Sequence, residues 1–184
     1  MVFLKNLQNH LRISETGPKV ILASITVFLF IFTSYPFFSA TKSVEIVKVV
    51  DGDTVDVRSE TKQHTVRLKG VDTPETQGYN NPEEFKGVSN QNWKCLEDWG
   101  YKAKDYVKRK IAGKKVSLSY RKGVLTVEKG AFNRMIGKIY IEDSNISLNK
   151  ALVKKGYARS YDDHYIDIER KARQNNTGLW QCRE

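Results

Sequence analysis

Apolar positions after residue 43 first follow the pattern of β-strands. A run rich in β-branched residues extends from Val44 to Val50 and ends at Asp51-Gly52, a pair typical of hairpin turns. Segments in which apolar and polar residues alternate follow at residues 54–57 and 65–68. Because side chains of a strand point alternately to its two faces, this alternation indicates strands with one buried face. The pattern predicts three strands, of which the first two form a hairpin.

The next apolar positions change to helical spacing. Between Leu96 and Ile111 they recur every three or four residues, and Gly113 is a natural stop for a helix. Alternation returns at residues 116–120 and 136–141, which predicts two more strands.

Two shorter helices are predicted near the C-terminus. Ser147 can cap one that stops at Gly156, and Asp162 or Asp163 can cap one that extends through Ala172. Three strands, a helix and two more strands fit an OB-fold. The predicted fold class is therefore α+β, with a five-stranded OB-fold barrel and about three helices.

Residues 1–42 differ in character from the rest of the chain. Three basic residues come first: Lys5, Arg12 and Lys19. Residues 20–41 then carry no charge, which is the arrangement of a signal peptide and is also long enough to cross a bilayer as a hydrophobic helix. A signal peptidase could cut after Ala40, but bulky Phe38 stands where a small residue is preferred, which favours an uncleaved membrane anchor. In both cases the domain at residues 43–184 is expected outside the cytoplasm, secreted or anchored to the membrane.

The charge of the chain favours a polyanionic partner. The net charge is +10 and the pI is about 9.5. Removing the first 40 residues takes away three of the 31 basic and one of the 21 acidic residues, which leaves +8. The basic character therefore belongs to the exported domain, and it suits nucleic acid or anionic lipid.

The two cysteines, Cys95 and Cys182, are an even number in a chain that is predicted to be exported. This favours a disulfide between them. Two separate buried thiols are the alternative.

Two acidic segments lie where strands end: Asp51-Gly-Asp53-Thr54 and Asp72-Thr73-Pro74-Glu75. A hard divalent cation prefers carboxylate and carbonyl oxygens on a fixed backbone, and Asp53 and Asp72 can supply two carboxylates. Arg67, in the strand that leads to the second segment, needs an anionic partner inside a barrel. A phosphate beside a metal would serve, because a guanidinium binds phosphate through two parallel hydrogen bonds. A salt bridge to Asp56 or Glu75 is the alternative.

These segments, with others along the chain, resemble the staphylococcal nuclease, or thermonuclease, family. The matching segments are VVDGDTVDV (49–57), VRLKGVDTPET (66–76), GKKVSL (113–118), FNRMIGKIYI (132–141), LNKALVKKGYARSY (148–161) and RKARQNNTGLW (170–180). The resemblance covers residues 43–182, and several motifs in the same order are more specific than any one of them. It implies a calcium-dependent endonuclease that hydrolyses DNA and RNA to products with 3′-phosphate ends.

The resemblance also implies a metal site. Asp53 and Asp72 would bind Ca²⁺ through their carboxylates, and the Thr73 carbonyl would help. Asp51 would support the metal-binding loop without touching the metal.

Further residues take roles toward the substrate by the same resemblance. Glu75 would orient or deprotonate the attacking water. Arg67 and Arg134 would bind the scissile phosphate and stabilise its developing charge. Tyr161 would contact the nucleotide. A monomer is the default expectation for the oligomeric state.

The chain departs from the family before the second arginine. Family members often show Asp-x-Tyr-Gly-Arg, whereas residues 130–134 read Gly-Ala-Phe-Asn-Arg. Asn133 can replace glycine because asparagine tolerates positive φ. Phe132 lacks the tyrosine hydroxyl and Gly130 lacks an acidic side chain, so the change is expected to weaken substrate contacts more than the chemistry.

Two alternatives to an active nuclease are open. One is a non-catalytic OB-fold module that binds nucleic acid or protein at the cell surface. The other is a structural surface protein whose basic face binds anionic lipid or wall polymers. Five chemically specific residues at the family's spacing favour the nuclease: Asp53, Arg67, Asp72, Glu75 and Arg134.

Overall fold

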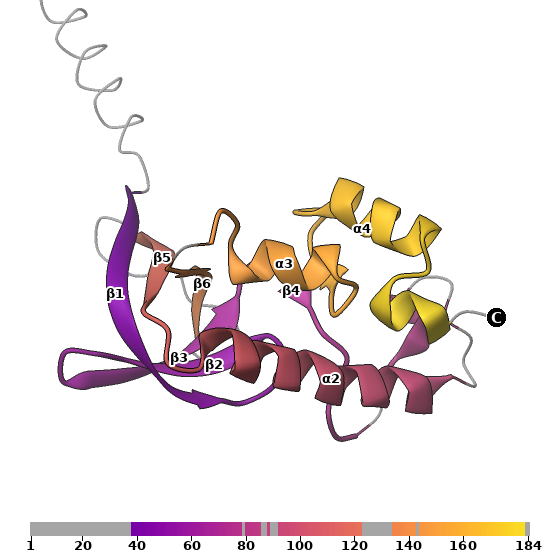
Figure 1. Cartoon of the computed structure of the whole chain (residues 1–184), viewed down its shortest axis with the longest axis horizontal. Coiled ribbons are helices and arrows are strands. Elements are labelled where there is room, and N and C mark those ends of the chain that lie inside the picture. The colour runs from indigo at the N-terminus through magenta and orange to yellow at the C-terminus, as the bar shows by residue number, and fades with distance from the viewer. Residues whose placement is uncertain are drawn as a thin grey trace, which may run out of the picture. The chain divides into compact units, whose positions relative to one another are not determined.

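Five strands close into a barrel with the neighbour order β1-β2-β3-β6-β5 (Figure 1). Their bounds are β1 Phe38–Val49, β2 Thr54–Ser59, β3 Lys62–Leu68, β5 Val116–Lys122 and β6 Met135–Ile141. The computed structural model describes residues 38–78, 80–85, 88, 92–122, 134–142 and 144–182. The β3–β6 pairing is parallel, and the other four pairings of the barrel are antiparallel. The predicted five-stranded OB-fold barrel is confirmed.

The first strand begins at Phe38, before its predicted start at Ser43. Residues 38–44 pair with β5 in one antiparallel register, in which Ala40 lies opposite Tyr120. Residues 38–42, which the sequence placed in the N-terminal segment, are therefore part of the barrel. Tertiary pairing with β5 decides this boundary.

The rest of the predicted signal or anchor, residues 1–37, lies outside the described residues. Across the part of the chain that is described, no helix combines the length and the apolar character needed to cross a membrane.

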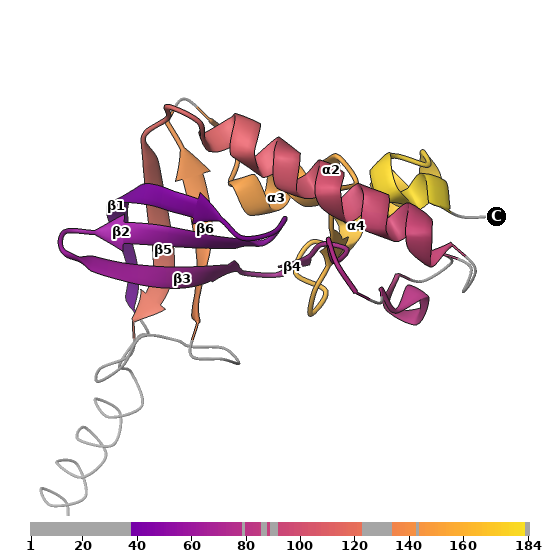
Figure 2. The same cartoon turned by 90° about the horizontal axis from the view of Figure 1, so that it is seen from below.

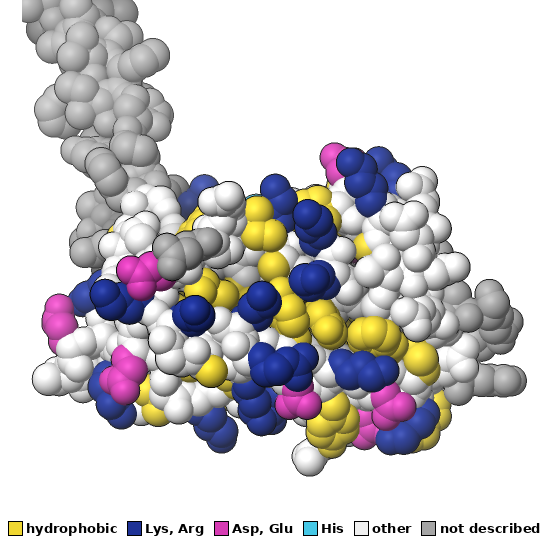
Figure 3. All heavy atoms as spheres, viewed as in Figure 1, with side chains coloured by type: hydrophobic (Ala, Val, Ile, Leu, Met, Phe, Trp, Pro, Cys, Tyr) yellow, Lys and Arg dark blue, Asp and Glu magenta, His cyan; other side chains and the backbone are white. Residues whose placement is uncertain are grey.

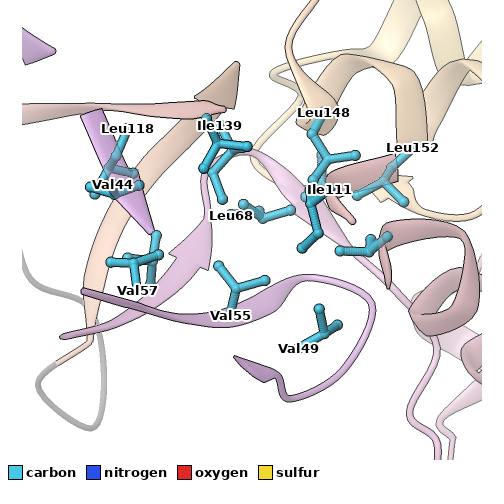
Figure 4. Packing of buried hydrophobic residues seen from close by; sticks show 14 of the residues in the cluster. Val44, Val49, Val55, Val57, Leu68, Ile111, Leu118, Ile139, Leu148 and Leu152 are labelled. Carbon is cyan, nitrogen blue, oxygen red and sulfur yellow. The ribbon is translucent and has the colours of Figure 1, made fainter. Parts of the chain in front are cut away.

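The barrel interior is filled by apolar side chains that alternate along the strands. Val55 and Val57 of β2 are completely buried. Figure 4 shows Ile111 of helix α2 (Trp93–Ile111) and Leu148 of helix α3 (Leu148–Lys154) in the same cluster, which extends the core beyond the barrel. Each fully buried aliphatic side chain of this kind stabilises the fold by about 1.5–3 kcal/mol.

Within the described part of the chain, three α-helices follow the predicted order. The Ser147 side chain accepts a hydrogen bond of 3.2 Å from the backbone N–H of Lys150, so it caps α3 as predicted. The last helix, α4 (Ile166–Gln174), begins later than predicted. Asp162 and Asp163 have φ of 51° and 55°, which is left-handed backbone, whereas an N-cap residue needs extended backbone. The prediction that one of them caps α4 was wrong.

A second, smaller apolar cluster lies beside the N-terminal half of α2. It joins Leu96 of α2 to Leu179 and Trp180 of the 3₁₀ helix η3 (Gly178–Cys182), all completely buried. Cys95 and Cys182 form a disulfide at its edge, with Cα atoms 5.8 Å apart. Figures 1 and 2 both show α2 running from the barrel to this C-terminal segment.

Candidate active site

Asp53 is held in the turn between β1 and β2 by backbone and side-chain donors. It is only 1% exposed. Its Oδ2 accepts the Thr73 N–H at 2.8 Å, and its Oδ1 accepts the Thr54 hydroxyl at 3.2 Å. The Asp51 carboxylate in turn accepts the Asp53 N–H at 3.0 Å, so Asp51 braces the turn from one side.

Asp72 reaches the same place from a different element. It lies on β4 (Val71–Asp72), which follows β3 directly on the side of the barrel that leads to the helices (Figure 2). The hydrogen bond from the Thr73 backbone N–H to the Asp53 carboxylate holds the two segments together. The two acidic segments predicted from the sequence therefore meet.

Arg67 joins the two carboxylates. It lies on β3 opposite Thr54, and its Nη1 donates to Asp53 Oδ1 while its Nη2 donates to Asp72 Oδ1 at 2.5 Å. The sequence offered Asp56 or Glu75 as salt-bridge partners. Neither forms the pair: Asp56 instead accepts the Thr65 hydroxyl at 2.7 Å.

Glu75 lies next to this group, on the loop after β4. Its backbone is fixed by Asn80, whose side chain accepts the Glu75 N–H at 2.7 Å and donates to the Glu75 carbonyl at 3.1 Å. Partial burial and the nearby Asp51 raise the pKa of the Glu75 carboxyl, while Arg67 and Arg134 act in the opposite direction. The charges of Arg67 and Arg134 therefore both act on the Glu75 carboxyl.

Arg134 immediately precedes β6, the strand that pairs in parallel with β3. This pairing brings the two predicted phosphate-binding arginines to neighbouring strands. The divergent residues 130–133 lie outside the described residues.

Arg159 was missed by the sequence interpretation. It lies on β7 (Arg159–Ser160), which pairs with β4 so that Arg159 is opposite Asp72. Its Nε donates to Asp72 Oδ2 at 2.8 Å. No periodicity could reveal it, because β7 has two residues and its partner is 87 positions away. Its place in the YARSY segment was the only signal.

Tyr161 follows this strand and is exposed. Its backbone N–H donates to the Gly70 carbonyl at 3.1 Å, and its ring centroid lies 5.7 Å from the Arg159 guanidinium carbon. The Tyr161 ring therefore lies beside the arginine that contacts Asp72.

The donor set suits calcium without a third acidic ligand. Among the described residues, His, Cys, Asp and Glu side chains form no group of three or more that could hold a metal ion. Calcium also takes backbone carbonyl and water oxygens, so Asp53, Asp72 and the Thr73 carbonyl can form a site. Burial raises the pKa of Asp53 well above its ordinary value despite Arg67, with Asp51 adding to the rise. A cation beside Asp53 would favour its charged form.

Comparison with known proteins identifies the family. The family described as "Staphylococcal nuclease homologue" matches residues 65–182. This chain belongs to the staphylococcal nuclease family. The prediction from the motifs is confirmed, and so is the enzyme class, a nuclease.

Proteins similar to this chain come from archaea and bacteria. An uncharacterized protein of Methanocaldococcus jannaschii is 38% identical over 147 residues, which are 74% of this chain and 70% of that protein. An uncharacterized endonuclease of Escherichia coli O157:H7 is 29% identical over 85% of this chain and 88% of its own length. The thermonuclease of Staphylococcus hyicus is 28% identical over 90% of this chain and 96% of its own length.

Proposed function

We propose that this protein is a calcium-dependent phosphodiesterase that hydrolyses DNA and RNA to products with 3′-phosphate ends. The observation that carries the proposal is the convergence of Asp53 and Asp72 on Arg67, in a chain of the staphylococcal nuclease family. The net charge of +10 suits a polyanionic substrate, and Figure 3 shows Lys and Arg side chains spread over the face drawn there.

Binding of calcium falls to Asp53, Asp72 and the Thr73 carbonyl. The ion, when bound, supplies positive charge against the phosphate. Arg67 and Arg134 bind the non-bridging oxygens of the scissile phosphate and stabilise the charge that develops there. Their planar forks suit this task because two parallel N–H groups match two phosphate oxygens.

Glu75 acts on the water. The water oxygen forms a bond to phosphorus while its proton passes to the Glu75 carboxylate. The bond between phosphorus and the 5′-oxygen breaks with its electron pair on that oxygen, which takes a proton from solvent water and leaves as a hydroxyl. Glu75 returns its own proton to solvent. The products are a 3′-phosphate and a 5′-hydroxyl.

The site of action that we propose is outside the cytoplasm. The Cys95–Cys182 disulfide supports this, because such bonds persist in oxidising compartments. A cut after Ala40 would remove paired residues from β1. This supports an uncleaved anchor over a cleaved signal peptide.

The test is cleavage of end-labelled single-stranded DNA and RNA in calcium and in excess chelator. We expect cleavage in calcium only, with phosphate on the 3′ ends of the products. Glu75→Gln keeps the size of the side chain but removes the proton acceptor, so single-turnover cleavage should fall about 10²–10⁴-fold.

Equal activity in chelator would reject the calcium assignment. Binding of the oligonucleotide without cleavage would instead support the OB-fold binding module.

A further inference from the structure

Arg159 contacts four groups at the candidate site, but it has no role in the proposed chemistry. Its Nε holds Asp72 Oδ2 at 2.8 Å, and its Nη2 lies 3.4 Å from Glu84 Oε2 on the 3₁₀ helix η1 (Pro82–Glu84). Its guanidinium carbon lies 5.6 Å from the Phe85 ring centroid and 5.7 Å from that of Tyr161. These four groups come from three separate segments, and they confine the side chain to 20% exposure.

Arg67 and Arg159 contact different oxygens of the Asp72 carboxylate. Arg67 takes Oδ1 and Arg159 takes Oδ2. Arg159 is also tied to Asp72 through the backbone, since the two residues are opposite each other in the β4–β7 pair.

This division matters for the proposed chemistry. Arg67 must turn from Asp53 and Asp72 to reach a phosphate. An aspartate without a second partner could then rotate about its side-chain bonds and lose its alignment. Arg159 is held by Glu84 and two aromatic rings, so its bond to Asp72 does not depend on where Arg67 points.

We propose that Arg159 is a positioning residue that holds Asp72 in the orientation in which it binds calcium, so that Arg67 is free to bind the phosphate. This inference rests on the proposed function, because it assumes that Asp72 is a calcium ligand. Arg159 touches neither the water nor the scissile phosphate in this role.

Charge repulsion alone predicts that loss of Arg159 does not weaken calcium binding. An arginine next to a cation site repels the cation, so its removal should leave calcium affinity unchanged or raise it. A positioning role predicts that removal lowers the affinity, since loss of a partner that orients a ligand typically costs about 10–100-fold. The sign of the change therefore separates the two roles.

The experiment is calorimetric calcium titration of the full-length protein without substrate, for the parent, Arg159→Gln and Arg159→Lys. Arg170→Gln is the matched control: it removes the same charge from α4, where Arg170 is 61% exposed and pairs with Asp167 at 2.9 Å. We expect calcium affinity to fall about tenfold or more in Arg159→Gln. Arg159→Lys should fall between that variant and the parent, because a lysine keeps the charge without the fork. Arg170→Gln should match the parent.

Unchanged or tighter calcium binding by folded Arg159→Gln would overturn the inference. If that variant does not fold, Arg159→Lys decides, and parental affinity in it would overturn the inference as well. A parent protein that binds no calcium would reject the proposed function together with the inference, whereas a parent that binds calcium leaves the variants to test the inference alone.

Discussion

At the scale of single residues, Arg67 is the most informative position. The two Nη atoms of its guanidinium donate to two carboxylates at once. A lysine at this position keeps the charge but can make only one such contact well. We expect Arg67→Lys to fold and to bind an oligonucleotide, but to cleave it about 10²–10³-fold more slowly in single-turnover assays.

A matched control comes from the same barrel. Arg58 on β2 is exposed and pairs with Glu45 at 3.1 Å, so Arg58→Lys should cleave at the parental rate. Circular dichroism shows whether both variants are folded. A rate for Arg67→Lys within about threefold of the parent would remove Arg67 from the catalytic assignment.

At the scale of elements, the end of α3 lies directly against the backbone at the start of η3. Gly156 ends this helix with φ of +67°, and a Cβ built there would lie 2.0 Å from the Thr177 carbonyl oxygen. The Gly156 carbonyl also accepts the Leu179 N–H at 2.7 Å, so the two backbones touch. We expect Gly156→Ala to destabilise the protein by more than about 2 kcal/mol, because it adds a backbone clash to the cost of left-handed backbone.

Gly113→Ala separates these two costs. Gly113 has nearly the same φ, +65°, but its Cβ would meet nothing within 4 Å. It should lose only about 1–2 kcal/mol, the cost of the backbone conformation. Urea unfolding measures both variants, and equal losses would mean that the contact between the two backbones contributes little.

At the scale of the whole domain, one covalent bond joins distant parts of the chain. The Cys95–Cys182 disulfide closes a loop across a sequence separation of 87 residues and connects α2 to η3. In the chain-entropy description such a loop contributes roughly 4–5 kcal/mol, mainly by restricting the unfolded chain. We expect the double variant Cys95→Ser/Cys182→Ser to lose stability on this scale in urea unfolding.

Reduction of the parent should lower its stability to the level of the double variant, which controls for the serine substitutions. Calcium-dependent cleavage should persist wherever the double variant is still folded, because the candidate site lies in the β1–β2 turn, on β3 and β4, in the loop after β4 and before β6, and none of these carries a cysteine of the disulfide. A loss below about 1 kcal/mol would show that the small cluster around the disulfide holds these segments without it.

The sequence alone determined the parts of this protein that depend on local order. Alternating apolar residues determined the barrel strands, and helical spacing determined α2, because each face is repeated at short intervals along the chain. The two acidic segments and Arg67 were also identified in advance, since strand ends bring such residues together.

Only the tertiary structure decided features that join distant residues. Pairing with β5 places the start of β1 at Phe38. Because Asp162 and Asp163 have left-handed backbone, α4 begins only after them. Arg159 could not be found from spacing, because its contact with Asp72 spans 87 residues through a two-residue strand. Local patterns record which face of an element is buried, whereas the partner of a charged side chain depends on how the whole chain folds back on itself.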